Sequence, residues 1–168
     1  MARHVIRVFA IFSLLASAAS MAGCYYRQGR LEKAVVAEIN NKCPAVSKPC
    51  QIDLNFIDWV DWDAMTVFAP GMDNLEINRV LGENAVGDSR YPLSLVMVLR
   101  HNGRVVYVEE DERNIEGYDG GEVEFYEDID RSLYRFVSYP HGAQMTVERL
   151  LGRNGPYYSL KCVNCPHD

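Results

Sequence analysis

The sequence contains no apolar run long enough to cross a membrane as a helix, which needs about 20 residues. Its N-terminal apolar segment, residues 8–19, is about a dozen positions long and is interrupted by Ser13 and Ser17. The chain also has no internal repeat and no low-complexity run, which excludes repeat architectures and compositionally disordered proteins. A length of 168 residues corresponds to about one domain.

The sequence also lacks the short motifs that mark common catalytic sites. It has no Gly-x-Ser-x-Gly, no His-Glu-x-x-His and no phosphate-binding glycine loop. The histidines after residue 23 are scattered over two predicted turns and the C-terminal tail: His101, His141 and His167. We therefore predict no catalytic residue, no bound metal and no cofactor, and we favour a protein that is not an enzyme.

The N-terminal segment contains no acidic residue before Glu32. Arg3, His4 and Arg7 precede the apolar segment, which ends in the small-residue series Ser20-Met21-Ala22-Gly23. A positive start, a short apolar region and small residues before the cleavage site are typical of a secretory signal peptide. We predict a signal peptide over residues 1–23.

The residues around the predicted cleavage site carry a resemblance to a known motif. Met21-Ala22-Gly23-Cys24 resembles the lipobox of bacterial lipoproteins, with methionine in place of the usual leucine. The resemblance implies that Cys24 carries diacylglycerol and further acyl chains, and two or more chains hold a protein stably on a membrane. Tyr25, not aspartate, follows Cys24. In the Gram-negative pattern this favours the periplasmic face of the outer membrane over the inner membrane. Residues 24–29 are predicted to be the lipidated N-terminus and tether.

Removal of residues 1–23 leaves a markedly acidic chain. The 17 Lys and Arg lose Arg3 and Arg7, so that 15 remain against 23 Asp and Glu, a net charge of −8. This charge argues against nucleic acid as a partner and against electrostatic docking on anionic lipid. The membrane contact then depends on the lipid, and the expected partner is a protein or another envelope component.

Four cysteines remain once Cys24 is assigned to lipidation: Cys43, Cys50, Cys162 and Cys165. An even number in an exported protein indicates disulfides, and four cysteines allow three pairings. We favour bonds between the two ends of the chain, because closure of a long loop stabilises most in the chain-entropy model. Local pairing, Cys43 with Cys50 and Cys162 with Cys165, stays open. Zinc and redox roles are less favoured, since no helix can follow Cys162-x-x-Cys165 to stabilise a thiolate.

The remaining pattern predicts one α+β domain over residues 30–168, with a mainly antiparallel sheet and about two helices packed on one face. Helices are expected over residues 30–41 and after Asp73, whose capping box includes Glu76 and whose end is marked by Gly82. Asn102-Gly103 predicts a hairpin turn. The strands are expected at residues 52–56, 64–68, 93–99, 105–108, 135–138, 145–151 and 157–162. Residues 93–99 are nearly all apolar, which is typical of a strand covered on both faces.

Residues 109–130 contain 11 of the carboxylates. Calcium loops need oxygen ligands at fixed offsets, and the Asp-x-Asp-x-Asp-Gly spacing is missing here. We predict a solvated loop and no specific metal site.

The segment Trp62-Asp63-x-Met65-x-Val67-Phe68-x-Pro70 resembles a stretch of small bacterial lipoproteins of unassigned function. The resemblance covers about 25 residues and implies a fold and no activity. Trp59 and Trp62 are expected in the core, with a binding surface as the alternative. The leading hypothesis is an envelope lipoprotein that acts as a binding or assembly module. The alternatives are a cell-wall hydrolase that uses Asp61 and Asp63, and a protective lipoprotein whose acidic face meets a basic toxin or enzyme.

Overall fold

A computed structural model describes residues 29–43, 50–87, 94–111, 121–125, 128–129, 135–152 and 155–165. The predicted signal peptide, Cys24 and the tether up to residue 28 lie outside the described residues, as do residues 112–120 and His167. None of the helices in the described ranges is long and apolar enough to cross a membrane.

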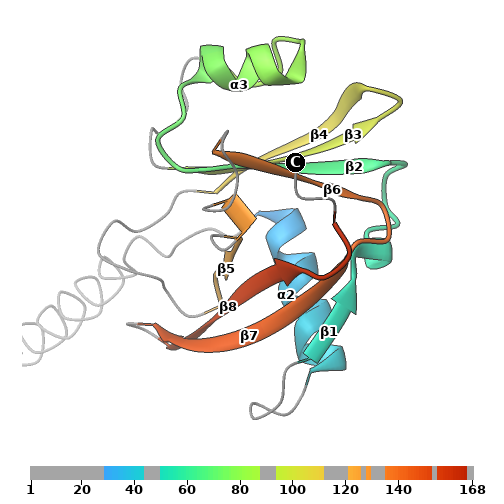
Figure 1. Ribbon diagram of the computed structural model, residues 1–168, viewed down its shortest axis with the longest axis vertical. Helices are drawn as coiled ribbons and strands as arrows, with labels where there is room; N and C mark the ends of the chain where they lie inside the picture. The colour runs from blue at the N-terminus through green and yellow to red at the C-terminus, as the bar shows by residue number, and fades with distance from the viewer. Residues whose placement is uncertain are drawn as a thin grey trace, which may run out of the picture.

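Eight strands and three helical segments make up the described fold (Figure 1). In chain order they are α2 (Arg30–Lys42), β1 (Cys50–Asp53), the 3-10 helix η1 (Leu54–Phe56), β2 (Ala64–Phe68), α3 (Asn74–Leu81), β3 (Leu95–His101), β4 (Arg104–Asp111), β5 (Val123–Glu124), β6 (Phe136–Pro140), β7 (Gln144–Gly152) and β8 (Gly155–Cys162).

The strands form two four-stranded sheets, in the orders β4-β3-β2-β6 and β1-β7-β8-β5. All neighbouring strands are antiparallel except β5 and β8, which pair in parallel. Figure 1 shows α3 above the β4-β3-β2-β6 sheet and α2 on its other side, with the second sheet. The predicted α+β class with mainly antiparallel strands is confirmed.

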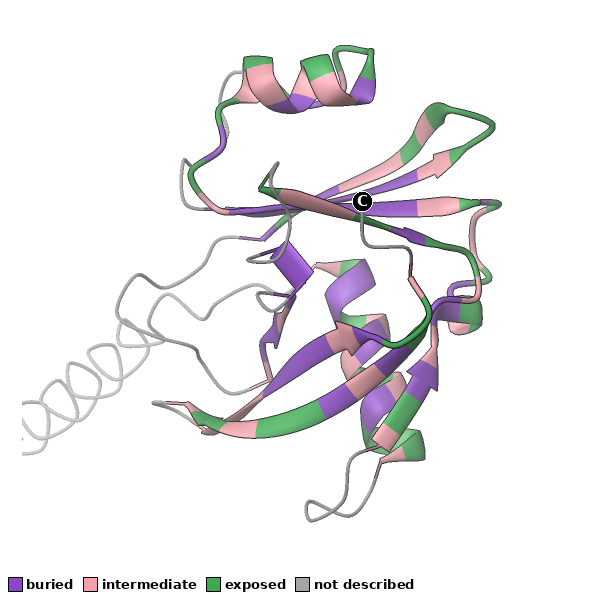
Figure 2. Ribbon diagram, viewed as in Figure 1, coloured by how far each residue is buried: buried purple, intermediate pink, exposed green. Residues whose placement is uncertain are grey.

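The helices differ from the expectation in their placement, since they cover opposite faces of the β4-β3-β2-β6 sheet. Leu95, Met97 and Leu99 of β3 pack in the larger core with α2 and both sheets. Val96 and Val98 of the same strand pack in a smaller core with α3. The nearly unbroken apolar run at residues 93–99 predicts a strand that is covered on both faces, because an apolar face left in water is unfavourable. Figure 2 shows the buried colour along these central strands.

The predicted ends of α3 and the predicted Asn102-Gly103 hairpin turn are confirmed. The Asp73 carboxylate accepts a hydrogen bond of 2.7 Å from the Glu76 backbone N–H, and Gly82 ends α3 with φ +74°. Asn102 and Gly103 both have positive φ, as the tightest hairpin turns require. The strand predicted at 52–56 is shorter, because Asp53 accepts a bond from the Asn55 N–H and turns the chain into η1.

The cysteines form the two local disulfides, Cys43–Cys50 and Cys162–Cys165. The favoured pairing between the two ends of the chain is therefore wrong. The reason is the strand order: Cys50 of β1 pairs with Val147 of β7, and Cys162 of β8 pairs with Met145 on the other side of β7. Two strand spacings, about 9–10 Å, separate β1 from β8. That distance exceeds the roughly 7 Å that a disulfide can span between Cα atoms.

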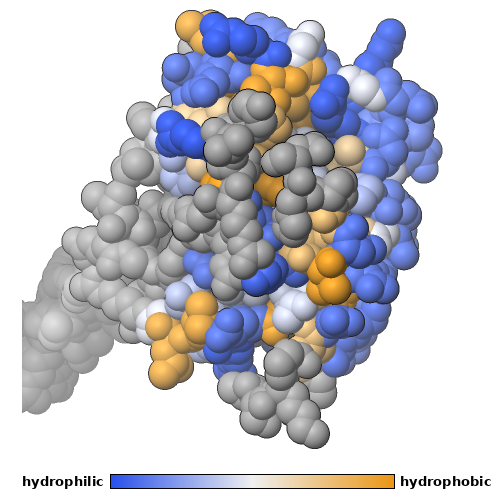
Figure 3. Space-filling model, in the orientation of Figure 1, coloured by the Kyte–Doolittle hydropathy of each residue, from blue (hydrophilic) through white to orange (hydrophobic). Residues whose placement is uncertain are grey.

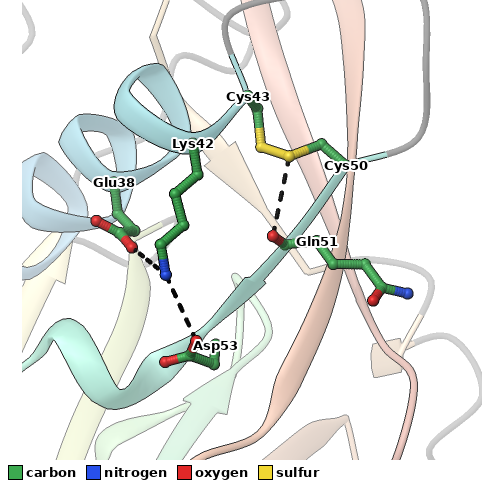
Figure 4. The surroundings of a disulfide bond; sticks show 6 residues. All are labelled: Glu38, Lys42, Cys43, Cys50, Gln51 and Asp53. Carbon is green, nitrogen blue, oxygen red and sulfur yellow. Dashed lines mark hydrogen bonds and ion pairs between the residues drawn. A yellow bond between two sulfur atoms is a disulfide. The ribbon is translucent and has the colours of Figure 1, made fainter.

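The Cys43–Cys50 bond joins the end of α2 to the start of β1 (Figure 4). The Lys42 ammonium lies 2.8 Å from a Glu38 carboxylate oxygen and 3.5 Å from one of Asp53. These contacts raise the pKa of Lys42, with the Glu38 hydrogen bond as the largest cause. The disulfide and the ion pairs together fix one end of α2 to β1.

The visible surface is largely hydrophilic, with smaller apolar areas beside α3 and at the hairpin end of β7 and β8 (Figure 3). Among the described residues, the exposed large apolar side chains lie at separate places in the sequence: Leu75, Val106, Leu151 and Val163.

Candidate functional site

One open cleft of about 340 Å³ lies at the end of the β4-β3-β2-β6 sheet. We call it the Trp62 cleft, after the aromatic side chain in its wall. Its polar lining comes from separate segments of the chain and consists of Asn55, Asp58, Asp61, His101 and His141. These five side chains are exposed.

Trp62 forms a fixed part of the wall. Its side chain is 5% exposed, and its indole N–H donates a hydrogen bond of 2.8 Å to the Ile57 carbonyl. The imidazole of His141 lies against it, with ring centroids 4.7 Å apart. The core role expected for Trp62 is confirmed by this burial, and the ring offers the cleft an apolar wall.

Trp59 belongs to a different cluster. The Arg30 guanidinium lies 4.0 Å from the centre of its ring, and Tyr107 meets it edge to face at 4.8 Å. Trp59 is not among the residues that line the Trp62 cleft. The structure thus places the two tryptophans of the predicted binding surface in separate surroundings.

Residue Asp63 brings the two histidines of the cleft together. Its backbone N–H donates to the Arg100 carbonyl and its carbonyl accepts from the His141 N–H, both at 2.8 Å. The cause is the register of β2, where Ala64 pairs with Arg100 of β3 on one side and with Pro140 of β6 on the other. The residues just beyond these pairs, His101 and His141, therefore flank Asp63.

The Asp63 carboxylate is engaged in holding the β3–β4 turn. One oxygen accepts a bond of 2.5 Å from the Asn102 N–H and lies 3.9 Å from His101 Nδ1. Asp61, in contrast, lines the cleft. The two carboxylates proposed for glycan hydrolysis thus have different surroundings, and Asp63 serves the turn.

The cleft offers hydrogen-bond acceptors and negative charge. Asp58 and Asp61 supply carboxylates, Asn55 supplies an amide, and the imidazoles of His101 and His141 supply one donor and one acceptor each when neutral. No group of three or more metal-ligating side chains occurs within the described part of the chain. The arrangement suits a polar ligand that carries positive charge or several hydroxyl groups.

A second polar cluster fixes the start of α2, the helix nearest to the predicted anchor. The buried Glu109 carboxylate of β4 accepts bonds of 2.6 Å from the Leu31 N–H, 2.9 Å from the Glu32 N–H and 2.7 Å from the Tyr107 hydroxyl. Burial, followed by Glu109, raises the pKa of Tyr107. A Cβ atom on Gly29 would overlap the Glu109 carboxylate carbon, which explains the glycine at the helix start.

The acidic segment differs from the solvated loop that its composition predicts. Four of its carboxylate side chains are at most 5% exposed: Glu109, Asp111, Glu122 and Asp128. The loop prediction is wrong for these residues, because they are buried. Glu109 accepts hydrogen bonds from backbone N–H groups of α2, and Asp128 accepts them from the Tyr139 hydroxyl and the Cys162 N–H. Composition cannot show such pairing, since the donors are distant in the sequence. Residues 112–120 of this segment lie outside the described ranges.

Comparisons with protein-family models, with curated proteins and with solved structures found no match to this chain.

Proposed function

We propose that this chain is a lipid-anchored protein of a bacterial envelope whose domain binds an envelope partner through the Trp62 cleft. The division of the cysteines carries the anchoring part of the proposal. Four of the five cysteines form disulfides, and the remaining one, Cys24, is the residue that the lipobox pattern assigns to the lipid. Two disulfides also suit an exported protein, since reducing compartments disfavour them.

The short tether keeps the domain beside the membrane. Residues 25–29 separate Cys24 from the first residue of α2. A fully extended chain covers about 3.3–3.6 Å per residue, so six steps from Cys24 to Arg30 span about 20 Å. Glu109 holds the first turn of α2 on the sheet, so the anchor acts on the folded domain without a long flexible linker.

The chemistry of the cleft supports the binding part. Asp58 and Asp61 lie in a chain whose predicted mature form carries a net charge of −8, with 15 Lys and Arg against 23 Asp and Glu. A field of this sign favours positively charged groups on a partner. We infer that the partner presents cationic or hydroxyl-rich groups, and that the domain binds and does not transform it.

Replacement of Cys24 by serine tests the anchor. We expect the C24S variant to lose acyl-lipid labelling and to accumulate as an unprocessed precursor, because the sulfur is the group that the lipid modifies. Labelling with a fatty-acid probe and membrane fractionation measure both effects. Unchanged maturation and unchanged membrane partition of C24S would contradict the anchor.

A matched pair of charge variants tests the cleft. D61N removes one exposed charge in the cleft, and E148Q removes one exposed charge on β7. Crosslinking in intact cells, followed by recovery of the protein from envelope membranes, should give a partner band with wild type and E148Q that D61N weakens at least threefold. Equal recovery by D61N and E148Q would contradict the cleft as the binding site.

A further inference from the structure

The end of the β7–β8 hairpin carries the most exposed large apolar side chain of the described residues. Leu151 is 93% exposed, and Leu75 on α3 follows with 76%. The register of the hairpin places further apolar groups beside Leu151, since Leu151 pairs with Pro156 and Leu150 pairs with Tyr157. Glycine, proline and small polar residues usually dominate turns, so two adjacent leucines are unusual there. We call Leu150, Leu151, Pro156 and Tyr157 the hairpin tip.

The hairpin tip extends past the strands on either side of it. β1 pairs with β7 only along residues 144–147, and β5 pairs with β8 only at residues 158–159. Figure 1 shows β7 and β8 continuing past both of these strands. The residues of β7 just before the tip, Glu148 and Arg149, are charged and exposed. The tip is thus an apolar projection with a charged rim.

Hydrogen bonds connect the hairpin tip to the start of α2, where the tether ends. The Gly121 N–H donates to the Pro156 carbonyl at 2.8 Å. Two residues further along the same segment, the Val123 N–H donates at 2.9 Å to a carboxylate oxygen of Glu32, in the first turn of α2. The tether from Cys24 to α2 spans about 20 Å when extended. The anchor can therefore lie in the same membrane surface as the tip.

The chemistry of the hairpin tip fits the boundary between lipid headgroups and acyl chains. Leucine side chains are stabilised on transfer from water to hydrocarbon, and tyrosine is enriched at membrane interfaces. The long stem of Arg149 can lie along apolar groups while its guanidinium stays at the level of the phosphates. The predicted mature chain has a net charge of −8, from 15 Lys and Arg against 23 Asp and Glu. This charge gives no general attraction to anionic lipid, so the contact depends on apolar insertion.

We infer that the hairpin tip inserts into the lipid bilayer that holds the anchor, as a second contact between the domain and the membrane. This inference rests on the lipid anchor of the proposed function. A tether alone leaves the domain free to rotate above the membrane. A second contact at the end of a rigid hairpin fixes which face of the domain lies toward the lipid, and with it the orientation of the Trp62 cleft.

The test measures whether position 151 lies among the acyl chains. The L151C variant of the mature lipidated protein is labelled with the fluorophore NBD; the four cysteines in disulfides do not react. It is then bound to vesicles of phosphatidylethanolamine and phosphatidylglycerol that carry a nitroxide quencher on the acyl chains. L75C is the matched control, because Leu75 is also strongly exposed and its replacement removes no core packing. We expect lipid quenching at position 151 to be at least threefold stronger than at position 75.

The outcomes separate the hairpin contact from the anchor. Vesicle-bound protein with equal quenching at positions 151 and 75 would overturn the hairpin contact and leave the anchor in place. Protein that does not bind the vesicles would contradict the anchor and overturn the hairpin contact with it. We expect quenching at position 151 to persist in about 1 M salt, where the Debye length is about 3 Å and charge attraction is screened. Loss of quenching at that salt concentration would overturn apolar insertion.

A photo-crosslinking amino acid in place of Leu151 tests the same contact in intact cells. We expect irradiation to join position 151 to phospholipid, which mass spectrometry of the purified protein detects. The same amino acid in place of Leu75 should give at most a third of that lipid adduct. A protein adduct at position 151 without a lipid adduct would identify a protein as the occupant and overturn the inference.

Discussion

Replacement of Glu109 by alanine should destabilise the protein more than replacement of any exposed carboxylate. Glu109 reaches across from β4 and caps α2, whose own N-cap residue, Gly29, has no side chain to do so. The E109A variant leaves two backbone N–H groups and one hydroxyl without their acceptor. An unpaired buried donor costs about 1–3 kcal/mol, and loss of a helix cap costs about 0.5–2 kcal/mol. The variant also removes the unfavourable burial of the Glu109 charge, which offsets part of these costs. We therefore expect the free energy of unfolding to fall by about 3 kcal/mol.

The expected loss is large enough to measure by several methods. For a chain of this length, 1 kcal/mol lowers the melting temperature by about 2–4 °C, so E109A should melt roughly 6–12 °C below wild type. Urea titration followed by circular dichroism should give the free energy of unfolding directly. Tyr107→Phe removes the hydroxyl that donates to Glu109 and should lower the free energy of unfolding by about 1 kcal/mol.

The control is Glu148→Ala, which removes an exposed carboxylate from β7. Exposed substitutions away from special contacts usually change stability by at most about 0.5 kcal/mol. If the free energies of unfolding of E109A and E148A differ by less than 0.5 kcal/mol, the capping role of Glu109 is refuted.

Three further predictions concern the disulfides, a buried tyrosine and calcium. A tryptic digest without reduction should yield residues 43–79 and 162–168 as separate peptides, each lighter by two hydrogens than its reduced form; a linked pair would contradict the local pairing. Burial, followed by the charge of Asp128, raises the pKa of Tyr139 above its ordinary 10.0. The unfolded chain therefore loses this proton above pH 10 while the folded protein keeps it. The contribution of Tyr139 to the free energy of unfolding should be constant below pH 10 and fall above it by up to about 1.4 kcal/mol per pH unit. Stability curves between pH 9 and 12 should show a smaller slope for Tyr139→Phe, and an equal slope would contradict the assignment. Millimolar calcium in moderate salt should leave the melting temperature unchanged, whereas a calcium-specific rise of roughly 4 °C or more would indicate a site that we do not expect.

The sequence by itself determined the elements whose signals are local. Asp73 and Glu76 predicted the start of α3, and Asn102-Gly103 predicted the turn between β3 and β4. These signals are readable because a cap or a tight turn is built from residues two to four positions apart, whose conformations sterics and nearby hydrogen bonds decide. The apolar run at residues 93–99 likewise predicted a strand covered on both faces.

Tertiary structure alone decided which distant residues meet. The place of β7 between β1 and β8 selects the local disulfides, and the register of β2 brings His101 and His141 to one cleft. The burial of Asp128 beside Cys162 depends on contacts with Tyr139 and with the end of β8. Periodicity gives the face on which a side chain lies but not the strand that will lie next to it. Strand order follows from packing the whole core at once, so the candidate site could not be predicted from the sequence as the helices and turns were.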